Sequence, residues 1–282
     1  MSAAVRRIAW GLALAALAAC GWLGQRPRGG AAAAGAPAPS PAAEMIVAGL
    51  GGFRGIAAEF VWFRADRLQG EGRFAELAQL ATWLTYLEPH TPEVWVYTAW
   101  NLAYNVSVMM PTPEDRWRWV EAGLRLLRDD GLRLNPADPV IYKELAWMFL
   151  QKIGGHLDSA APCYRAEWAR QVAAARAAGT LAALGLEPAR MAAVDAEYGA
   201  QDWEDPFASA LYWAARGLEV AKKPARRAEL RQLVYQALLF ETRQDPRFAP
   251  RALREMRAAY AETPSPDLLR MIEFFRAHHG LK

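Results

Sequence analysis

The chain has 282 residues, of which 53% are apolar and 22% charged, so it can bury a sizeable core and is not disordered as a whole. Ala, Leu and Arg are abundant and β-branched residues are few, which favours helices over strands. The formal net charge of +3 falls to about +1 if Arg6 and Arg7 leave with a targeting segment, so composition gives no support for general nucleic-acid binding.

Residues 1–24 have the layout of an export signal. Arg6 and Arg7 precede an apolar run that is too short to span a bilayer comfortably, since a spanning helix needs about 20 residues. The run ends in Leu17-Ala18-Ala19-Cys20, which resembles a bacterial lipobox. The resemblance implies a mature chain that begins at Cys20 and is tethered to a membrane by acyl chains, with Gly21 in place of an aspartate implying the outer membrane.

Two other interpretations of this segment stay open. Because Trp22 and Leu23 continue the apolar run, it can instead be an uncleaved signal anchor, which would hold the chain in the inner membrane. It can also be an ordinary export signal that is cleaved. All three interpretations place the body of the protein in the bacterial cell envelope, facing the periplasm.

Residues 25–44, QRPRGGAAAAGAPAPSPAAE, have the composition of a linker. A Pro/Ala/Gly-rich segment cannot bury enough apolar area to offset the entropy of ordering it, so we predict a disordered tether. The folded body is then expected to occupy residues 45–282.

From Met45 onward, apolar residues recur at helical spacing, and the chain is predicted to be all-α. One predicted helix runs through FAELAQLATWLTYLEP and ends at Pro89. Three later helices are predicted to begin where a polar residue precedes a proline, at Thr91-Pro92, Thr112-Pro113 and Asp138-Pro139. In each case the polar side chain can cap the helix, and a proline in the first turn removes no hydrogen bond.

Pro136 and Pro139, three positions apart, mark a tight reversal in which one helix ends and the next begins. These units resemble the tetratricopeptide repeat, a helix-turn-helix of about 34 residues. The resemblance implies a right-handed solenoid of helical hairpins. The residues that carry it are Tyr142, Leu145, Ala146 and Phe149 in one unit, Trp95 and Ala99 in the preceding unit, and Gly72, Phe74 and Pro89 in the unit before that.

The repeat pattern is clearest over residues 58–150 and divergent over 151–282. Pro89 and Pro136 are 47 residues apart, longer than the repeat length of about 34. After Gly154-Gly155 the pattern is lost, and a long helix is predicted through HLDSAAPCYRAEWARQVAAARAAG. A further hairpin is predicted after Asp205-Pro206, followed by two helices that finish the array.

The repeat resemblance implies a concave surface that binds a protein or peptide partner. The candidate contacts are the aromatic residues of one helix, some of which must be core because they lie around more than one face: Trp95, Tyr97, Trp100 and Tyr104. A second candidate is the loop in which Asp202 and Glu204 flank Trp203. This loop either docks a partner, a cation or a sugar, or it packs Trp203 onto the body while Asp205 caps a helix.

No motif in the sequence assigns a reaction. The histidines His90, His156, His278 and His279 lack the spacing of a metal site, and Cys163 is the single thiol left if Cys20 is lipidated. We therefore predict no catalytic residue, no metal and no cofactor. A basic group near one helical turn is interpreted either as a contact for anionic lipid or an acidic partner, or as a solvated helix face with ion pairs; it comprises Lys222, Lys223, Arg226, Arg227 and Arg231.

Together these patterns predict a membrane-tethered envelope scaffold or adaptor, not an enzyme, that binds a protein or peptide and no nucleic acid. The alternative is a glycan-binding module or a glycan-acting enzyme that uses the loop at 202–205. An enzyme of that class would need two carboxylates facing one another across a site.

Overall fold

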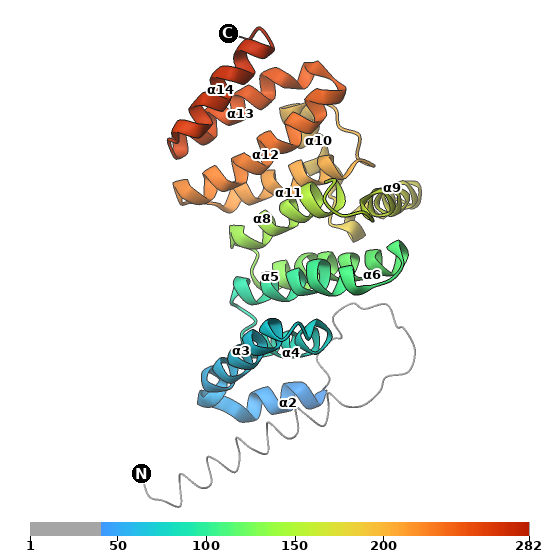
Figure 1. The fold of residues 1–282 in the computed structure, drawn as a ribbon, viewed down its shortest axis with the longest axis vertical. Coiled ribbons are helices and arrows are strands. Elements are labelled where there is room, and N and C mark those ends of the chain that lie inside the picture. The colour runs from blue at the N-terminus through green and yellow to red at the C-terminus, as the bar shows by residue number, and fades with distance from the viewer. Residues whose placement is uncertain (1–40, 282) are drawn as a thin grey trace, which may run out of the picture. The chain divides into compact units, whose positions relative to one another are not determined.

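The computed structural model describes residues 41–281, and every regular element in that range is a helix (Figure 1). The all-α prediction is therefore confirmed. The chain divides into two compact units, Met1–Glu88 (unit 1) and Pro89–Lys282 (unit 2). The predicted signal, Cys20 and the linker as far as residue 40 lie outside the described residues.

Unit 1 contains helix α2 (Pro41–Leu50), a short turn η1 (Gly51–Phe53), and the antiparallel pair α3 (Arg54–Gly70) and α4 (Phe74–Leu87). Gly72 makes the turn between α3 and α4 with a φ of 69°, a left-handed conformation that favours glycine. Small and branched side chains fill the interface: Ala58, Ala65 and Leu68 from α3 and Leu77, Ala81 and Leu84 from α4. Because α2 begins at Pro41, the predicted linker boundary at residue 44 was wrong by about one helical turn.

Unit 2 is a longer array of helices. Its elements in chain order are α5 (Pro92–Trp100), η2 (Asn101–Val106), η3 (Ser107–Met109), α6 (Pro113–Arg125), η4 (Leu126–Gly131), α7 (Leu132–Leu134), α8 (Pro139–Trp147), η5 (Met148–Ile153), α9 (Ala161–Ala178), η6 (Leu181–Leu184), α10 (Pro188–Tyr198), α11 (Pro206–Val220), α12 (Pro224–Gln244), η7 (Pro246–Phe248), α13 (Ala249–Glu262) and α14 (Pro266–His278).

The helices α5 and α8 are internal copies of each other, offset by 47 residues. Each begins with a proline, runs for 9 residues and continues into a π-helical stretch of 6 residues. Their side chains repeat as well: the Trp95 indole donates to the Pro89 carbonyl at 2.9 Å, and the Tyr142 hydroxyl, 47 residues later, donates to the Pro136 carbonyl at 2.9 Å. The two copies, α5–η2 and α8–η5, thus share local geometry as well as sequence spacing.

The helix starts are only partly as predicted. Asp138 accepts a hydrogen bond from the Val140 amide at 2.9 Å and Thr112 accepts one from the Asp115 amide at 3.1 Å, so both are N-caps. Thr91 occupies the N-cap position of α5 as predicted, but its side chain makes no cap hydrogen bond. Pro92 still begins the helix, because its fixed φ suits the first helical turn.

Each copy packs against an antiparallel second helix through a glycine. In the first copy, a Cβ on Gly131 of η4 would lie 3.4 Å from the Cβ of Trp95. In the second, a Cβ on Gly217 of α11 would lie 3.0 Å from the Cβ of Tyr142, the counterpart of Trp95. A Cβ on Gly154, at the far end of η5, would meet Phe207 at the start of α11, so α11 runs antiparallel to α8–η5. The partner of α8 is therefore α11, and the pattern that the sequence loses at Gly154 resumes after residue 205.

Residues 154–205, which contain α9 and α10, form an insertion between the two helices of the second copy. The helix predicted from His156 begins five residues later, at Ala161, because the segment around Asp158 forms bends and turns.

A buried ion pair fixes the start of the insertion: the Lys152 ammonium lies 2.6 Å from the Asp158 carboxylate, and the two side chains are 4% and 10% exposed. Asp158 also accepts from the Tyr164 hydroxyl at 3.1 Å and from the Ala160 amide at 2.9 Å. The Lys152 ammonium lies over the Tyr164 ring, 5.7 Å from its centroid.

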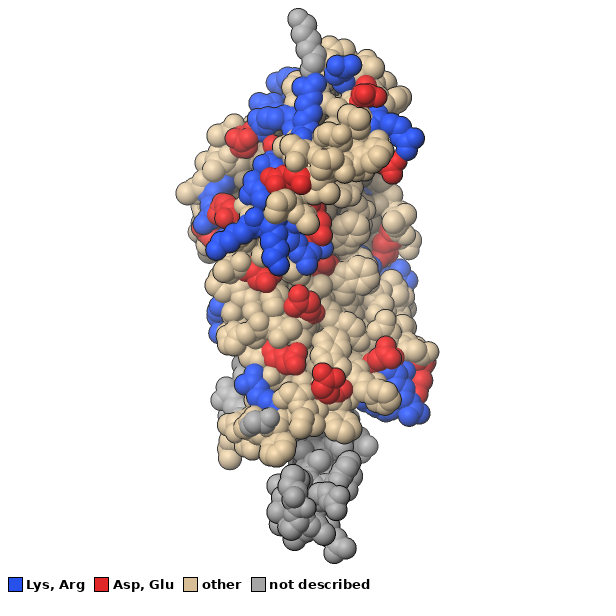
Figure 2. All heavy atoms as spheres, turned by 90° about the vertical axis from the view of Figure 1, so that its left-hand side faces the viewer, with Lys and Arg blue, Asp and Glu red and all other residues tan. Residues whose placement is uncertain are grey.

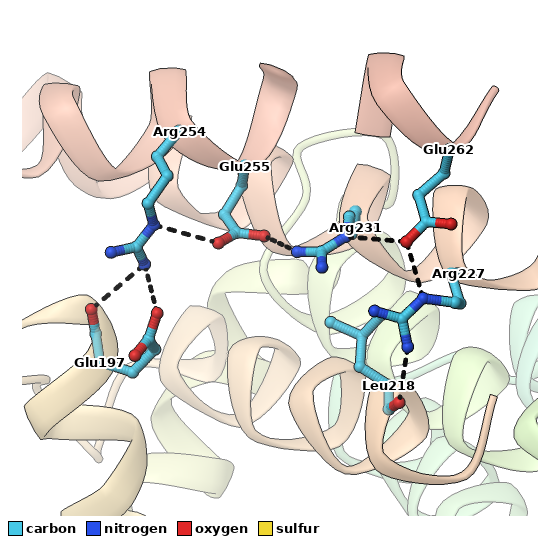
Figure 3. A network of polar contacts seen from close by, with 7 residues as sticks. All are labelled: Glu197, Leu218, Arg227, Arg231, Arg254, Glu255 and Glu262. Carbon is cyan, nitrogen blue, oxygen red and sulfur yellow. Dashed lines mark hydrogen bonds and ion pairs between the residues drawn. The ribbon is translucent and has the colours of Figure 1, made fainter. Parts of the chain in front are cut away.

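The C-terminal helices are joined by a chain of ion pairs (Figure 3). Arg254 of α13 reaches Glu197 of α10 at 2.6 Å, and Arg231 of α12 reaches Glu255 of α13 at 2.7 Å. Arg227 joins the same network through Glu262 at 2.7 Å. Basic residues of α12 are thus paired between helices, beyond the pairing within a helix that the sequence indicated.

Candidate functional site

Two of the seven predicted partner-binding residues lie in the protein core. Trp95 is buried and hydrogen-bonded to the Pro89 carbonyl. Trp203 is buried too, with its indole N–H 3.3 Å from an Asp195 oxygen and its ring edge-on to Tyr212. Neither ring is open to a partner, so both leave the candidate set.

The other aromatic residues predicted to bind a partner, in α5 and its continuation η2, lie closer to the surface. Trp100 is 41% exposed, and its ring stacks on Tyr104 with 4.3 Å between centroids. Tyr97 is half-buried, one turn earlier on the same helix. These three residues repeat at spacings of three and four, which places them on one face.

The next copy of the helix adds a carboxylate to this face. The Trp100 indole N–H donates to the Glu144 carboxylate of α8. Trp147, one turn further along α8, is half-buried and lies beside the Tyr104 hydroxyl. We call the group formed by Tyr97, Trp100, Tyr104, Glu144 and Trp147 the α5–α8 surface.

Glu144 is unusual because its carboxyl group is buried without a cationic partner in hydrogen-bond range. Its one hydrogen bond between side chains comes from the neutral Trp100 indole. Burial raises the pKa of Glu144 to about 7, against the lowering effects of the Trp100 hydrogen bond and of Lys143. Burial also raises the pKa of Tyr104, and the charge of Glu144 raises it further, so this hydroxyl stays neutral.

A buried carboxylate beside an exposed indole can bind an organic cation. A guanidinium or ammonium group above Trp100 would interact with its ring and supply the charge that Glu144 lacks. Lys152 does not do so, because its ammonium pairs with Asp158 and contacts Tyr104 from 5.1 Å. The α5–α8 surface is therefore suited to an arginine or lysine side chain from another molecule.

Sequence reasoning missed Glu144 and Trp147, although a signal was present. Trp100 and Trp147 each end the α-helical part of their helix, eight residues after its proline, and Glu144 occupies the position that corresponds to Tyr97. Aligning the two copies by their prolines would have placed all four residues on one face. Burial of Glu144 has no such signal, because it depends on how α5 and α8 pack.

The loop at 202–205 is occupied by structural contacts. Asp205 accepts from the Phe207 amide at 2.9 Å and caps α11, as the structural interpretation predicted. Asp202 is exposed and accepts from the Glu204 amide at 3.0 Å, while Glu204 pairs with Arg176 at 3.2 Å. With Trp203 buried, this loop presents no aromatic ring for a sugar.

A second buried carboxyl lies behind this loop. Glu241 of α12 is 8% exposed, and one of its oxygens has no hydrogen-bond partner. Burial raises the pKa of Glu241 to about 7, and the nearby charges of Asp205, Asp202 and Asp245 raise it further. Asp205 is engaged as a helix cap, so these carboxylates do not form a free pair of the kind that glycan hydrolysis requires.

Glu241→Gln is expected to stabilise the protein at alkaline pH and to leave it unchanged at acidic pH. The pKa of Glu241 is higher in the folded state than its ordinary value. The free energy of unfolding is therefore highest while Glu241 is neutral, and it falls as pH rises through about 7 and the buried carboxyl group ionises. Glutamine stays neutral, so the gain in unfolding free energy is about 1–3 kcal/mol near pH 8 and close to zero near pH 4, below the ordinary carboxyl pKa of 4.5. Urea unfolding at both pH values measures it. Equal effects at the two pH values would contradict the prediction.

The basic group at the α11–α12 turn is a mixture of paired and unpaired side chains. Figure 2 views the side of unit 2 on which α11 ends and α12 begins, and it shows Lys and Arg atoms gathered there with Asp and Glu atoms between them. Lys222 and Lys223 are exposed, while Arg226 pairs with Glu229 at 2.8 Å. Of the two interpretations of the basic group, a solvated helix face with ion pairs accounts for these contacts and requires no ligand.

Cys163 is half-buried, and burial raises its pKa, which disfavours the thiolate. Within residues 41–281, no cluster of His, Cys, Asp and Glu has the arrangement of a metal site. In the same range, no helix has both the length and the apolar character needed to cross a membrane.

Comparison of the chain with protein-family models, curated proteins and solved structures gives no match.

Proposed function

We propose that the protein is a membrane-tethered adaptor of the bacterial cell envelope, without enzymatic activity, that binds a protein segment at the α5–α8 surface. The observation that carries the proposal is the buried, uncompensated Glu144 carboxyl beside the exposed Trp100 ring. The partner segment would place an arginine or lysine over Trp100 and apolar side chains along Tyr97 and Trp147.

The arrangement of the helices supports a binding role. Equivalent helices from the two copies supply the five residues of the surface: α5 with its continuation η2 in the first copy, and α8 in the second. Repeated helical units commonly present such side-by-side faces to extended peptides, as the resemblance to tetratricopeptide repeats implies. The tether follows from the lipobox-like Leu17-Ala18-Ala19-Cys20 and rests on sequence resemblance alone.

Selection from a randomised peptide library tests the binding site without a known partner. Peptides selected on the wild-type protein are expected to contain an arginine or lysine next to apolar residues. Their affinity should fall about tenfold or more with Glu144→Gln or Trp100→Ala. Glu93→Gln removes an exposed carboxylate of α5 and serves as the matched control, with no loss expected. Selected peptides that bind all four proteins equally would refute the site.

The same peptides should bind more tightly as pH rises from about 6 to about 8, because only the ionised carboxylate attracts their cation. The change should centre near the pKa of Glu144, about 7, and should disappear in Glu144→Gln. Titration by fluorescence anisotropy measures it. A pH dependence that survives in Glu144→Gln would assign the effect to another group.

A further inference from the structure

One face of α3, together with Phe53 at its N-cap, carries large apolar side chains that the described part of the chain leaves open. Phe53, Ile56, Phe60 and Phe63 are between 49% and 75% exposed. Their spacings of three, four and three residues place them within an arc of about 80° at about 100° per residue. We call these four residues the α3 apolar stripe.

The stripe is separate from the surface by which α3 packs in unit 1. Ala58, Ala65 and Leu68 face α4 and are buried on the opposite side of the helix. One apolar side of α3 packs within unit 1. The other is expected to contact a second apolar surface, since exposed clusters of large apolar residues mark interaction sites.

The position of the stripe in the chain identifies that environment. This step rests on the proposed membrane tether. Twenty residues separate Cys20 from the start of α2, and they can span at most about 70 Å in any conformation. The stripe therefore belongs to the first folded unit after the attachment point, where a tether gives even a weak membrane contact a high effective concentration.

Charge supports the same environment. Arg6 and Arg7 leave with the signal, and the segment that follows Cys20 contains Arg26 and Arg28 and, as far as residue 43, no acidic residue. Exposed Arg64 directly follows Phe63 at the C-terminal end of the stripe. Phenylalanines flanked by arginine are typical of a helix that lies in the interface of an anionic bilayer.

We propose that the α3 apolar stripe lies on the surface of the membrane to which the chain is tethered, so that the helix inserts its phenylalanine side chains between the lipid head groups. The tether and the stripe then form two attachments. Together they would hold unit 1 against the bilayer.

Depth-dependent quenching tests the proposal on the full chain. The protein is reconstituted into vesicles of equimolar phosphatidylethanolamine and phosphatidylglycerol that contain brominated acyl chains. An environment-sensitive dye is attached at Phe63→Cys, or at Gln79→Cys on the exposed side of α4 as the control, both in a Cys163→Ser background. We expect blue-shifted emission and loss of most of the fluorescence at position 63, with neither change at position 79. Phe53→Ser combined with Phe60→Ser should reverse the effect at position 63.

Three outcomes would overturn the proposal. If the protein sediments with the vesicles but the dye at position 63 is not quenched, the stripe does not touch the bilayer and the tether stands. If two dyes at position 63 self-quench without lipid contact, a second copy of the chain covers the stripe. If the protein does not sediment with the vesicles, both the stripe and the proposed tether fail.

Discussion

Replacement of Lys152 by alanine is expected to lower the free energy of unfolding by about 2–3 kcal/mol, because it leaves the Asp158 carboxylate with Arg116, 3.6 Å away, as its remaining cationic partner. Lys152 is 4% exposed, and its ammonium lies 2.6 Å from Asp158. Its removal also takes away a cation from between the rings of Tyr104 and Tyr164. The insertion that begins after η5 would lose its fixed starting point, so the loss should be accompanied by faster proteolysis of residues 154–160.

The control for this prediction is a lysine in a similar but more exposed pair. Lys143 lies 3.2 Å from Glu229, with both side chains about one-third exposed or more. Lys143→Ala should cost less than about 1 kcal/mol, since solvent screens exposed pairs. Guanidinium unfolding of both variants measures the difference. If Lys152→Ala costs no more than Lys143→Ala, the buried pair does not fix the insertion.

Replacement of Trp213 by alanine is expected to cost about 3–5 kcal/mol, the usual range for a large aromatic residue removed from a core. Trp213 of α11 is 1% exposed, and its ring centroid lies 6.4 Å from that of Tyr142 on α8 and 5.2 Å from that of Tyr212. The Arg216 guanidinium lies over the same rings, 5.7 Å from that of Trp213. A cavity here would loosen the helix pair that the insertion separates in sequence.

Phe274→Ala on α14 provides an exposed aromatic control, because this ring is 73% exposed. Its effect should stay within about 0.5 kcal/mol. Thermal unfolding followed by circular dichroism compares the two variants. A similar melting temperature for both would show that α8 and α11 do not depend on Trp213 for their packing.

The start of each helix could be read largely from neighbouring residues. Asp138, Thr112 and Asp205 cap the helices that the sequence assigned to them, and prolines open those helices. Thr91 shows the limit of this reasoning, since a suitable residue type did not form the cap bond. A cap depends on the conformation of three or four residues, so sequence gives its location but leaves its hydrogen bond open.

The candidate site could be predicted only in part. The sequence identified Trp100, Tyr97 and Tyr104 as aromatic residues on one helix, but it could not separate them from buried Trp95. The turns at η2 and η5 are π-helical and shift the direction of the side chains that follow. The spacing of four residues allows Trp100 and Tyr104 to stack, but the exposure of Trp100 depends on which helices pack against α5, and the local pattern does not contain that information.

Amino-acid order was enough to establish that the described chain is helical, where most of the helices that start with proline begin, and that α5 and α8 are 47 residues apart, because these properties depend on side chains within a few positions of one another. Tertiary packing decided that α11 pairs with α8 across an insertion of about fifty residues, and it decided that Glu144 is buried beside an exposed tryptophan. Both outcomes arise from contacts between segments far apart in the chain. Such contacts are selected by the fit of whole helix faces, and the local pattern of either segment does not contain that information.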